Sequence, residues 1–318
     1  MPMPPVLRSL LAAVAVAGLL AACRPAPSDP DGAARSDLSR PSLAVQALTR
    51  HMRSGDFAAF ARDAVPPALH ARLQIAWQAG DTRWPLDELP FSERLPDVLT
   101  ALAEPGSEAR LAAGFERQFA GAARELRAAA TSLGLFGVQY VEHQGDFSSG
   151  ERDHYAQLIA AISRWGAGAP LSDSARARDA IDRLAAAARA AGPSSADALA
   201  AAGMEDSLTR IGGFSNAAKA VLAGYGLDLD AAFDSVTARL LVQQGDRATV
   251  RLRYELAGSA IDTLVELERI DGQWYLADYL RHARAATAGV AAGAAPGPAT
   301  APDADPGQAP AREPAAAP

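Results

Sequence analysis

The sequence predicts an α+β protein in which a mainly helical body, residues 41–235, precedes a C-terminal four-stranded antiparallel meander, residues 236–283. Through the body, apolar side chains recur every three or four positions, which is the spacing of one face of a helix. Beyond it the period changes to two, which is the spacing of a half-buried strand. The flanking residues 23–40 and 284–318 are rich in Ala, Pro and Gly, so we expect a flexible tether and a disordered tail.

The first part of the body predicts three short helices with recognisable ends. Ser42 is a suitable N-cap for the first helix, and Gly55 is a suitable stop. Asp56 can cap the second helix, which we expect to run to Pro66. Pro67 is well placed as the first residue of the third helix, because a helix needs no backbone N–H there.

The longest apolar stripe of the body predicts a single helix closed by Gly134. The stripe consists of Leu111, Phe115, Phe119, Ala122, Leu126, Ala129 and Leu133. Such a narrow stripe also suits a coiled coil, but it lasts too few heptads to require one, and a core helix is the simpler interpretation. The apolar run that follows, Leu135–Val141, fits either a short strand or more helix.

Further helices are expected in the rest of the body. They cover residues 155–165, 177–188, 195–202 and 216–223, with Gly166 and Gly192 as stops for the first two. The run Gly212–Ser215 resembles a phosphate-binding loop only superficially, because it lacks a preceding strand and three spaced glycines. It predicts a turn between two helices, with Ser215 as the cap of the second.

The meander is predicted from alternation and from its turns. Apolar side chains alternate with polar ones from Ala248 to Leu256, as expected of a strand with one face buried. Gly245-Asp246 is a turn signal before this strand, and Asp271-Gly272 is a turn signal before the last strand. The last strand is expected from Trp274 to Leu280. One face of this sheet should pack on helices and the other should face water.

The N-terminus has the three parts of a signal peptide, residues 1–22. Arg8 precedes an apolar run that is shorter than the ~20 residues of a membrane span. The run ends in Leu20-Ala21-Ala22-Cys23, which resembles the lipobox of bacterial lipoproteins at all four positions. The resemblance implies a diacylglycerol thioether on Cys23 and a further acyl chain, such as palmitate, on its freed amine. Arg24 stands where retention signals for the inner membrane usually have Asp, which implies the outer membrane, facing the periplasm.

Composition excludes several classes of partner and site. Cys23 is the only cysteine, so a lipid on it leaves none for a disulfide, a thiolate metal ligand or a thiol nucleophile. Without residues 1–22 the chain has 29 basic and 37 acidic side chains, a net charge of −8. An acidic body without a basic cluster argues against binding to nucleic acid or to anionic lipid.

The last hairpin carries a second resemblance. The run from Ile270 to Tyr279 has an Asp-Gly turn followed by Trp, and is similar to the last hairpin of the nuclear-transport-factor-like α+β cone. The opening, Leu48–Phe60, is similar to that family's first two helices, whereas the long helical stretch between is not. The resemblance implies a cone that binds a small apolar ligand, and it makes Tyr254, Leu267 and Trp274 the candidate ligand-binding residues.

Polar clusters offer two further candidate sites. His143 and His154 are possible metal ligands with Glu142, Glu151 and Asp153, but their spacing is not that of a specific site and favours a surface loop. A basic face on the meander is the other candidate, and we expect its arginines to pair with acidic neighbours across the strands. The arginines are Arg239, Arg247, Arg251 and Arg253, and the acidic residues are Glu255, Asp262, Glu266 and Glu268.

Three tryptophans, Trp77, Trp84 and Trp165, suit either a sugar-binding groove or the hydrophobic core, and we expect the core. No nucleophile elbow, zinc-protease motif or penicillin-binding motif is present, so we assign no catalytic residue and no cofactor. The leading hypothesis is a lipid-anchored, non-enzymatic protein that binds, scaffolds or maintains the envelope. The alternatives are a binder of a small apolar ligand and a cell-wall hydrolase. The expected partners are the membrane, through the lipid, and an envelope protein or that ligand.

Overall fold

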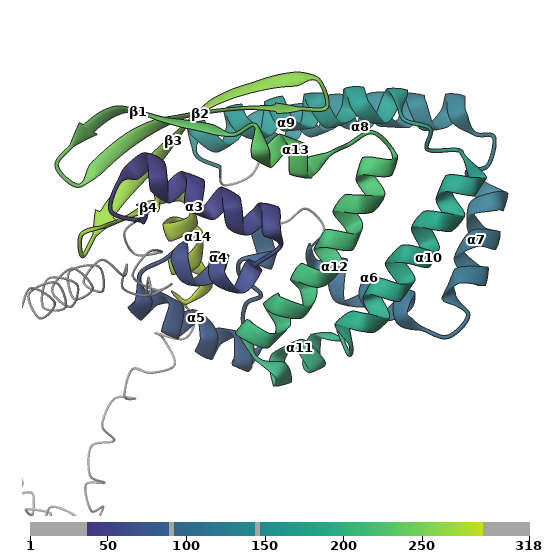
Figure 1. The fold of residues 1–318 in the computed structure, drawn as a ribbon, viewed down its shortest axis with the longest axis horizontal. Helices are drawn as coiled ribbons and strands as arrows, with labels where there is room; N and C mark the ends of the chain where they lie inside the picture. The colour runs from purple at the N-terminus through teal and green to yellow at the C-terminus, as the bar shows by residue number, and fades with distance from the viewer. Residues whose placement is uncertain (1–36, 89–91, 144–146, 289–318) are drawn as a thin grey trace, which may run out of the picture.

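The computed structural model describes residues 37–88, 92–143 and 147–288 (Figure 1). The predicted signal peptide, most of the predicted tether and residues 289–318 of the predicted tail lie outside the described residues. The predicted α+β class is confirmed, because a helical body is followed by a four-stranded antiparallel sheet. None of the described helices is both long and apolar enough to cross a membrane.

The helices of the body follow one another through short connections. In chain order they are α3 (Pro41–Ser54), α4 (Phe57–Asp63), α5 (Pro67–Ala79), the 3₁₀ turns η2 (Leu86–Glu88) and η3 (Ser92–Arg94), α6 (Leu95–Ala103), α7 (Ser107–Gln118), α8 (Ala123–His143), α9 (Ser149–Gly168), α10 (Ser174–Ala191), α11 (Ala196–Ala202), α12 (Met204–Gly224) and α13 (Leu229–Asp234). The first helix begins at Pro41 rather than after a Ser42 cap, because Arg40 takes the extended N-cap conformation.

The sheet has the predicted meander order, β1-β2-β3-β4. Its strands are β1 (Thr237–Gln244), β2 (Arg247–Leu256), β3 (Ser259–Ile270) and β4 (Gln273–Leu276). Asp271 and Gly272 both have positive φ, 51° and 81°, which is the conformation that a two-residue hairpin turn requires.

The predicted last strand, Trp274–Leu280, is wrong at its end. The strand stops at Leu276 and the chain continues as helix α14 (Ala277–Ala286), which also takes in the first residues of the predicted tail. The reason lies in packing, because a helix places Leu280 and Ala283 on one face, and both are fully buried in the main core. A short apolar run cannot reveal this choice by itself.

The inner face of the sheet packs on α3. Ala248, Val250, Leu267 and Trp274 form one buried cluster with Leu38 and with apolar side chains of α3. Leu38 is also fixed through its backbone, since the Trp274 N–H donates to its carbonyl oxygen at 2.8 Å. The predicted tether through residue 40 is therefore too long, because its last residues already belong to the folded body.

The other end of the sheet packs on α9. Ala161 of α9 lies in a second buried cluster with Leu256 and Ile261 of the strands. Only the last four residues of β3 pair with β4. Nearer the start of β3, the Gln157 side chain bonds to the backbone at the strand edge, as a neighbouring strand would. Its side-chain amide accepts from the Asp262 N–H and donates to the Asp262 carbonyl, both at 3.0 Å.

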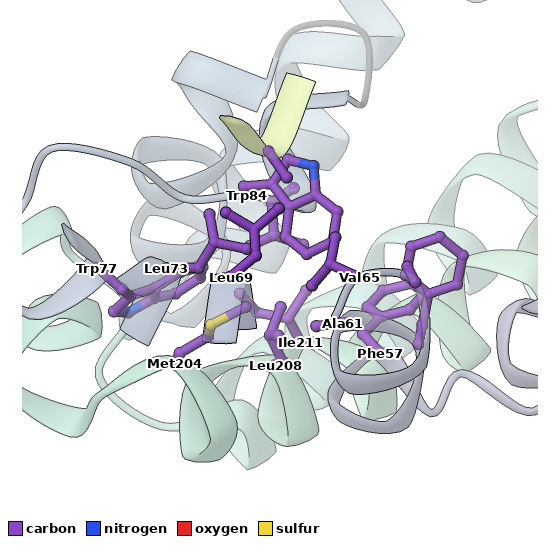
Figure 2. Close-up of a cluster of buried hydrophobic side chains, with 14 of the residues drawn as sticks. Phe57, Ala61, Val65, Leu69, Leu73, Trp77, Trp84, Met204, Leu208 and Ile211 are labelled. Atoms are coloured by element: carbon purple, nitrogen blue, oxygen red, sulfur yellow. The ribbon is translucent and has the colours of Figure 1, made fainter. Parts of the chain in front are cut away.

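The main core lies among α4, α5 and α12 (Figure 2). Trp77 and Trp84 are 0% and 1% exposed there, so the expectation that they are core residues is confirmed. The indole N–H of Trp77 donates to the Leu199 carbonyl at 2.9 Å, which satisfies its polar group inside the core. Trp165 is half-buried and donates to the Tyr225 carbonyl, also at 2.9 Å.

The single helix expected to end at Gly134 is two helices. The chain leaves helix between α7 and α8, where Gly121 has a φ of 77°. Helix α8 then continues through Gly134 and the ambiguous run Leu135–Val141. A Cβ on Gly134 would lie 2.1 Å from the Ser163 Oγ of α9, so this glycine permits a close helix contact and is not a stop. Gly166, also expected to be a stop, lies within α9.

The turn expected at Gly212–Ser215 is also wrong, because these residues lie inside α12. A Cβ on Gly212 would lie 2.0 Å from the carbonyl oxygen of Gly55, at the junction of α3 and α4. The Asn216 side chain donates to the Ser54 carbonyl at 2.9 Å next to this contact. The glycine therefore allows α12 to cross directly against the backbone of the α3–α4 turn.

This contact predicts opposite effects for two neighbouring glycines. Gly212→Ala should lower the free energy of unfolding by about 1–3 kcal/mol, because the new methyl group meets a backbone atom that cannot move aside. Gly213→Ala is the matched control, since a Cβ there has no atom within 4 Å and alanine favours helix by up to ~1 kcal/mol. Urea unfolding followed by circular dichroism measures both, and equal stabilities would contradict the assignment.

Candidate functional site

A cluster of charged side chains joins three distant segments of the chain, and we call it the polar junction. It consists of Glu88 at the end of η2, Glu151 in the first turn of α9, and Arg281 and His282 of α14. The His282 Nδ1 lies 2.6 Å from Glu88 Oε2, and its Nε2 lies 3.4 Å from Glu151 Oε1. The imidazole ring is therefore held between two carboxylates.

Glu151 is the most buried member of the polar junction, with 8% of its side chain exposed. It closes a capping box, because the Ser148 N–H donates to Glu151 Oε2 at 2.7 Å and Ser148 Oγ accepts from the Glu151 N–H at 3.1 Å. The Arg281 guanidinium donates to the same carboxylate. Glu151 thus fixes the start of α9 to α14.

Glu88 connects the polar junction to the main core. Its Oε1 accepts from the indole N–H of Trp84 at 3.0 Å, while its Oε2 faces His282. Trp84 itself is buried, so the position of the Glu88 carboxylate is set by core packing. A charged group held in this way is part of the fold and is not a mobile surface side chain.

The electrostatics of the polar junction favour a protonated His282. The hydrogen bond with Glu88 raises the pKa of His282 above its usual value, burial opposes this rise, and the charges of Glu88 and Glu151 add to it. Nearby, burial raises the pKa of the Tyr155 hydroxyl to about 12, and the charges of Glu151 and Glu88 contribute to the same shift. The pKa of Tyr279 is raised for the same reasons, burial first.

A pocket of about 310 Å³ lies beside the polar junction. Its walls are the first residues of α9, the first residues of α14 and the outer face of β2 and β3, including Arg247. Glu266, Glu268 and Asp278 bring three carboxylates to its lining. A pocket with convergent carboxylates is the arrangement that hydrolysis of a glycan would use.

Each of those three carboxylates is already engaged. Glu266 accepts from the Thr249 hydroxyl at 3.0 Å, and Glu268 lies 3.4 Å from the Arg284 guanidinium. Asp278 accepts from the Ser148 hydroxyl at 3.1 Å and pairs with Arg281. The pocket therefore does not offer a carboxylate poised to transfer a proton to a ligand.

Ser148 contacts Glu151 of the polar junction, and its bonds are those of a helix cap. Its Oγ accepts from the Glu151 N–H and donates to Asp278. The ring nitrogens of His282 face Glu88 and Glu151 instead. A nucleophilic serine needs a base that takes its proton, and these contacts do not supply one.

The three residues predicted to bind a small apolar ligand do not surround a common space. Leu267 and Trp274 are 1% and 2% exposed and belong to the cluster under α3. Tyr254 packs against the other cluster, next to α9, and its hydroxyl lies 2.7 Å from His154 Nε2. These side chains fill the core of the sheet, and only Leu267 reaches the lining of the pocket.

The two candidate metal-binding histidines have different partners. His143 ends α8, and its Nδ1 lies 3.0 Å from the Gln139 carbonyl. His154 lies in α9, where burial lowers its pKa below the usual value. Within the described residues, no three His, Cys, Asp or Glu side chains are arranged to hold a metal ion.

The arginines on the outer face of the meander pair in part as expected. Arg251 donates to both carboxylate oxygens of Asp262, at 2.7 and 2.6 Å, and Arg253 donates to the same group at 2.9 Å. The hydrogen bond from Arg251, followed by that from Arg253, lowers the pKa of Asp262 to about 2. Asp262 therefore offsets one of the two positive charges in this part of the predicted basic face.

Comparison with protein-family models, with curated proteins and with solved structures found no match. The two resemblances noted in the sequence, to bacterial lipoproteins and to the nuclear-transport-factor-like cone, therefore stay predictions. The polar junction was not among the predicted sites. Only one of its features has a local sequence signal, the Ser148–Glu151 capping box, because the other members come from segments far apart in the chain.

The polar junction predicts a pH-dependent contribution to stability. Because the pKa of His282 is raised in the folded state, its stabilising effect is complete below its unfolded pKa of about 6.5 and is lost as the pH rises through the folded value. His282→Asn should therefore lower the free energy of unfolding by about 1–3 kcal/mol in mild acid, and by less in mild base.

Unfolding of the wild type and the variant in guanidinium, between about pH 5 and pH 9, measures this difference. His143→Asn is the matched control, since His143 is an exposed histidine that makes only a local contact within α8. A stability difference for His282→Asn that stays constant across the range would contradict the assignment.

Proposed function

We propose that this chain is a lipid-anchored protein of the outer membrane, facing the periplasm, that acts by binding or scaffolding and not by catalysis. The lipobox-like run Leu20-Ala21-Ala22-Cys23 supports the anchor. Residues 24–36 separate Cys23 from the folded body, and even fully extended they span only about 50 Å. The body would therefore work close to the membrane surface.

The observation that carries a binding role is the exposed surface of α8. Residues 128–141 of this helix contain no charged side chain. Leu133 and Phe136 are each 70% exposed, and Tyr140 is 57% exposed. Contiguous exposed apolar side chains on a folded protein mark interaction surfaces.

The two alternative functions have less support. The apolar-ligand binder needs an open cone, whereas Leu267 and Trp274 fill the space under the sheet. The cell-wall hydrolase needs a free acid, base or nucleophile, whereas the carboxylates of the pocket and the Ser148 hydroxyl are engaged in structural hydrogen bonds. We therefore favour binding over both.

Anchoring is tested by substitution of the cysteine. In a Gram-negative host, the wild-type chain should incorporate labelled palmitate and sediment with the outer membrane, because two or three acyl chains give stable attachment. Cys23→Ala should lose the label.

Arg24→Asp is the companion variant, and it should keep the label but move to the inner membrane. A wild-type chain that carries no label would refute the anchor. An Arg24→Asp variant that stays in the outer membrane would refute the role given to Arg24.

A further inference from the structure

We propose that the exposed stripe of α8 pairs with the same stripe of a second copy of this chain. The stripe consists of Ala129, Leu133, Phe136 and Tyr140, all of them exposed. Their spacings of four, three and four positions are those of a coiled-coil seam. A seam of this kind buries its apolar side chains only when a second helix lies along it.

Helix α8 is supported by α9 on a face that neighbours the stripe. It packs against α9, and the two helices run side by side as a hairpin (Figure 1). Gly134 and Gly137 lie in this contact, since a Cβ on either would meet Ser163 or Ile159 of α9 within 3.0 Å. At about 100° per residue, the stripe lies roughly 100–160° around the helix from Gly134 and roughly 40–100° from Gly137. It therefore flanks the contact with α9, and its side chains stay exposed.

Residues 24–36 and 289–318 carry few side chains that could cover the stripe. Residues 24–36 contain no Leu, Ile, Met or aromatic residue, and residues 289–318 have Val290 as their only large aliphatic side chain. A membrane surface is also a poor occupant, because helices that lie on membranes carry Lys and Arg beside their apolar face. The absence of any charge from residue 128 to residue 141 does not fit that pattern.

A second copy fits the stripe in an antiparallel arrangement. A two-fold axis between Leu133 and Phe136 places each of these residues opposite the other in the partner, so that the contact occurs twice. The same axis places the small Ala129 opposite the large Tyr140. Because no charged side chain lies in this part of α8, the pairing buries no unpaired charge.

The size of the stripe sets the strength of the association. Large apolar side chains have about 150–250 Å² of surface each, and the three in each stripe are 57–70% exposed. Two stripes can therefore bury roughly 500–1,050 Å², less than the ~1,200 Å² of a stable interface. We therefore expect weak and reversible pairing in solution. Confinement of both copies to one membrane would raise their local concentration, and this last step rests on the proposed lipid anchor.

Photo-crosslinking in cells tests the contact directly. The full chain carries a photoreactive phenylalanine analogue at position 136, and should give a covalent dimer of twice the chain mass. The matched control carries the analogue at position 135, since Leu135 is 65% exposed on the same helix but lies outside the stripe, and should give at least about tenfold less dimer.

Absence of the dimer at position 136, or a crosslink there to another protein or to lipid alone, would overturn the proposal. The readout does not depend on the anchor. If the chain forms the dimer but is not anchored, only the anchor is refuted. If the chain is anchored but forms no dimer, only the pairing is refuted.

A charge exchange tests the antiparallel register. Leu133→Arg and Phe136→Glu should each reduce co-purification of two differently tagged copies by at least about tenfold, because each dimer would bury two unpaired charges. A mixture of the two variants should restore co-purification, because the arginine of one copy then faces the glutamate of the other.

Leu135→Glu should leave co-purification unchanged. Both stripe residues are 70% exposed, so each variant should fold, and circular dichroism checks this. Failure of the mixture to restore pairing would overturn the register proposed here.

Discussion

The Glu151 carboxylate is the constraint on which the arrangement of this protein depends. It caps the first turn of α9, accepts from Arg281 and faces His282, and so ties the start of α9 to α14. Helix α14 in turn buries Leu280 and Ala283 in the main core. Because α8 packs on α9, this buried group acts together with the packing of α9 on the sheet to fix the position of the α8–α9 hairpin.

Burial of charge is costly unless each charge has a partner. In the polar junction, each charged side chain lies next to one of opposite charge. Two carboxylates, Glu88 and Glu151, face one guanidinium and one imidazole whose pKa they raise. Such a group is suited to hold segments in register, because its charged members come from three segments and contact one another. The members of the polar junction are thus engaged with one another, as expected of groups with a structural role.

The periodicity of the sequence predicted the α+β class, the meander order and most helices, because those features follow from local spacing. The errors came mainly from glycines. Gly55 and Gly192 end helices with positive φ as predicted, whereas Gly134, Gly166 and Gly212 lie inside helices. A sequence records only the missing side chain, and a glycine that permits a left-handed turn looks the same as one that permits two backbones to approach. Apart from the Ser148–Glu151 capping box, the polar junction could not be predicted, since its members meet only after the fold has formed.

The stripe of α8 shows a further limit of prediction from periodicity. Spacing predicts that apolar side chains share one face of a helix, but not whether that face is buried. Ala129 and Leu133 belonged to a stripe interpreted as a core helix, and Phe136 belonged to the ambiguous run after it, but Leu133 and Phe136 face water. The small residues Gly134 and Gly137 bring α8 close to α9, and this makes a rigid support out of two long helices. A partner that binds a rigid helix face loses little conformational entropy from the protein side, so even a small apolar surface contributes to affinity. The glycines that misled the prediction of helix ends are therefore the residues that hold this surface in place.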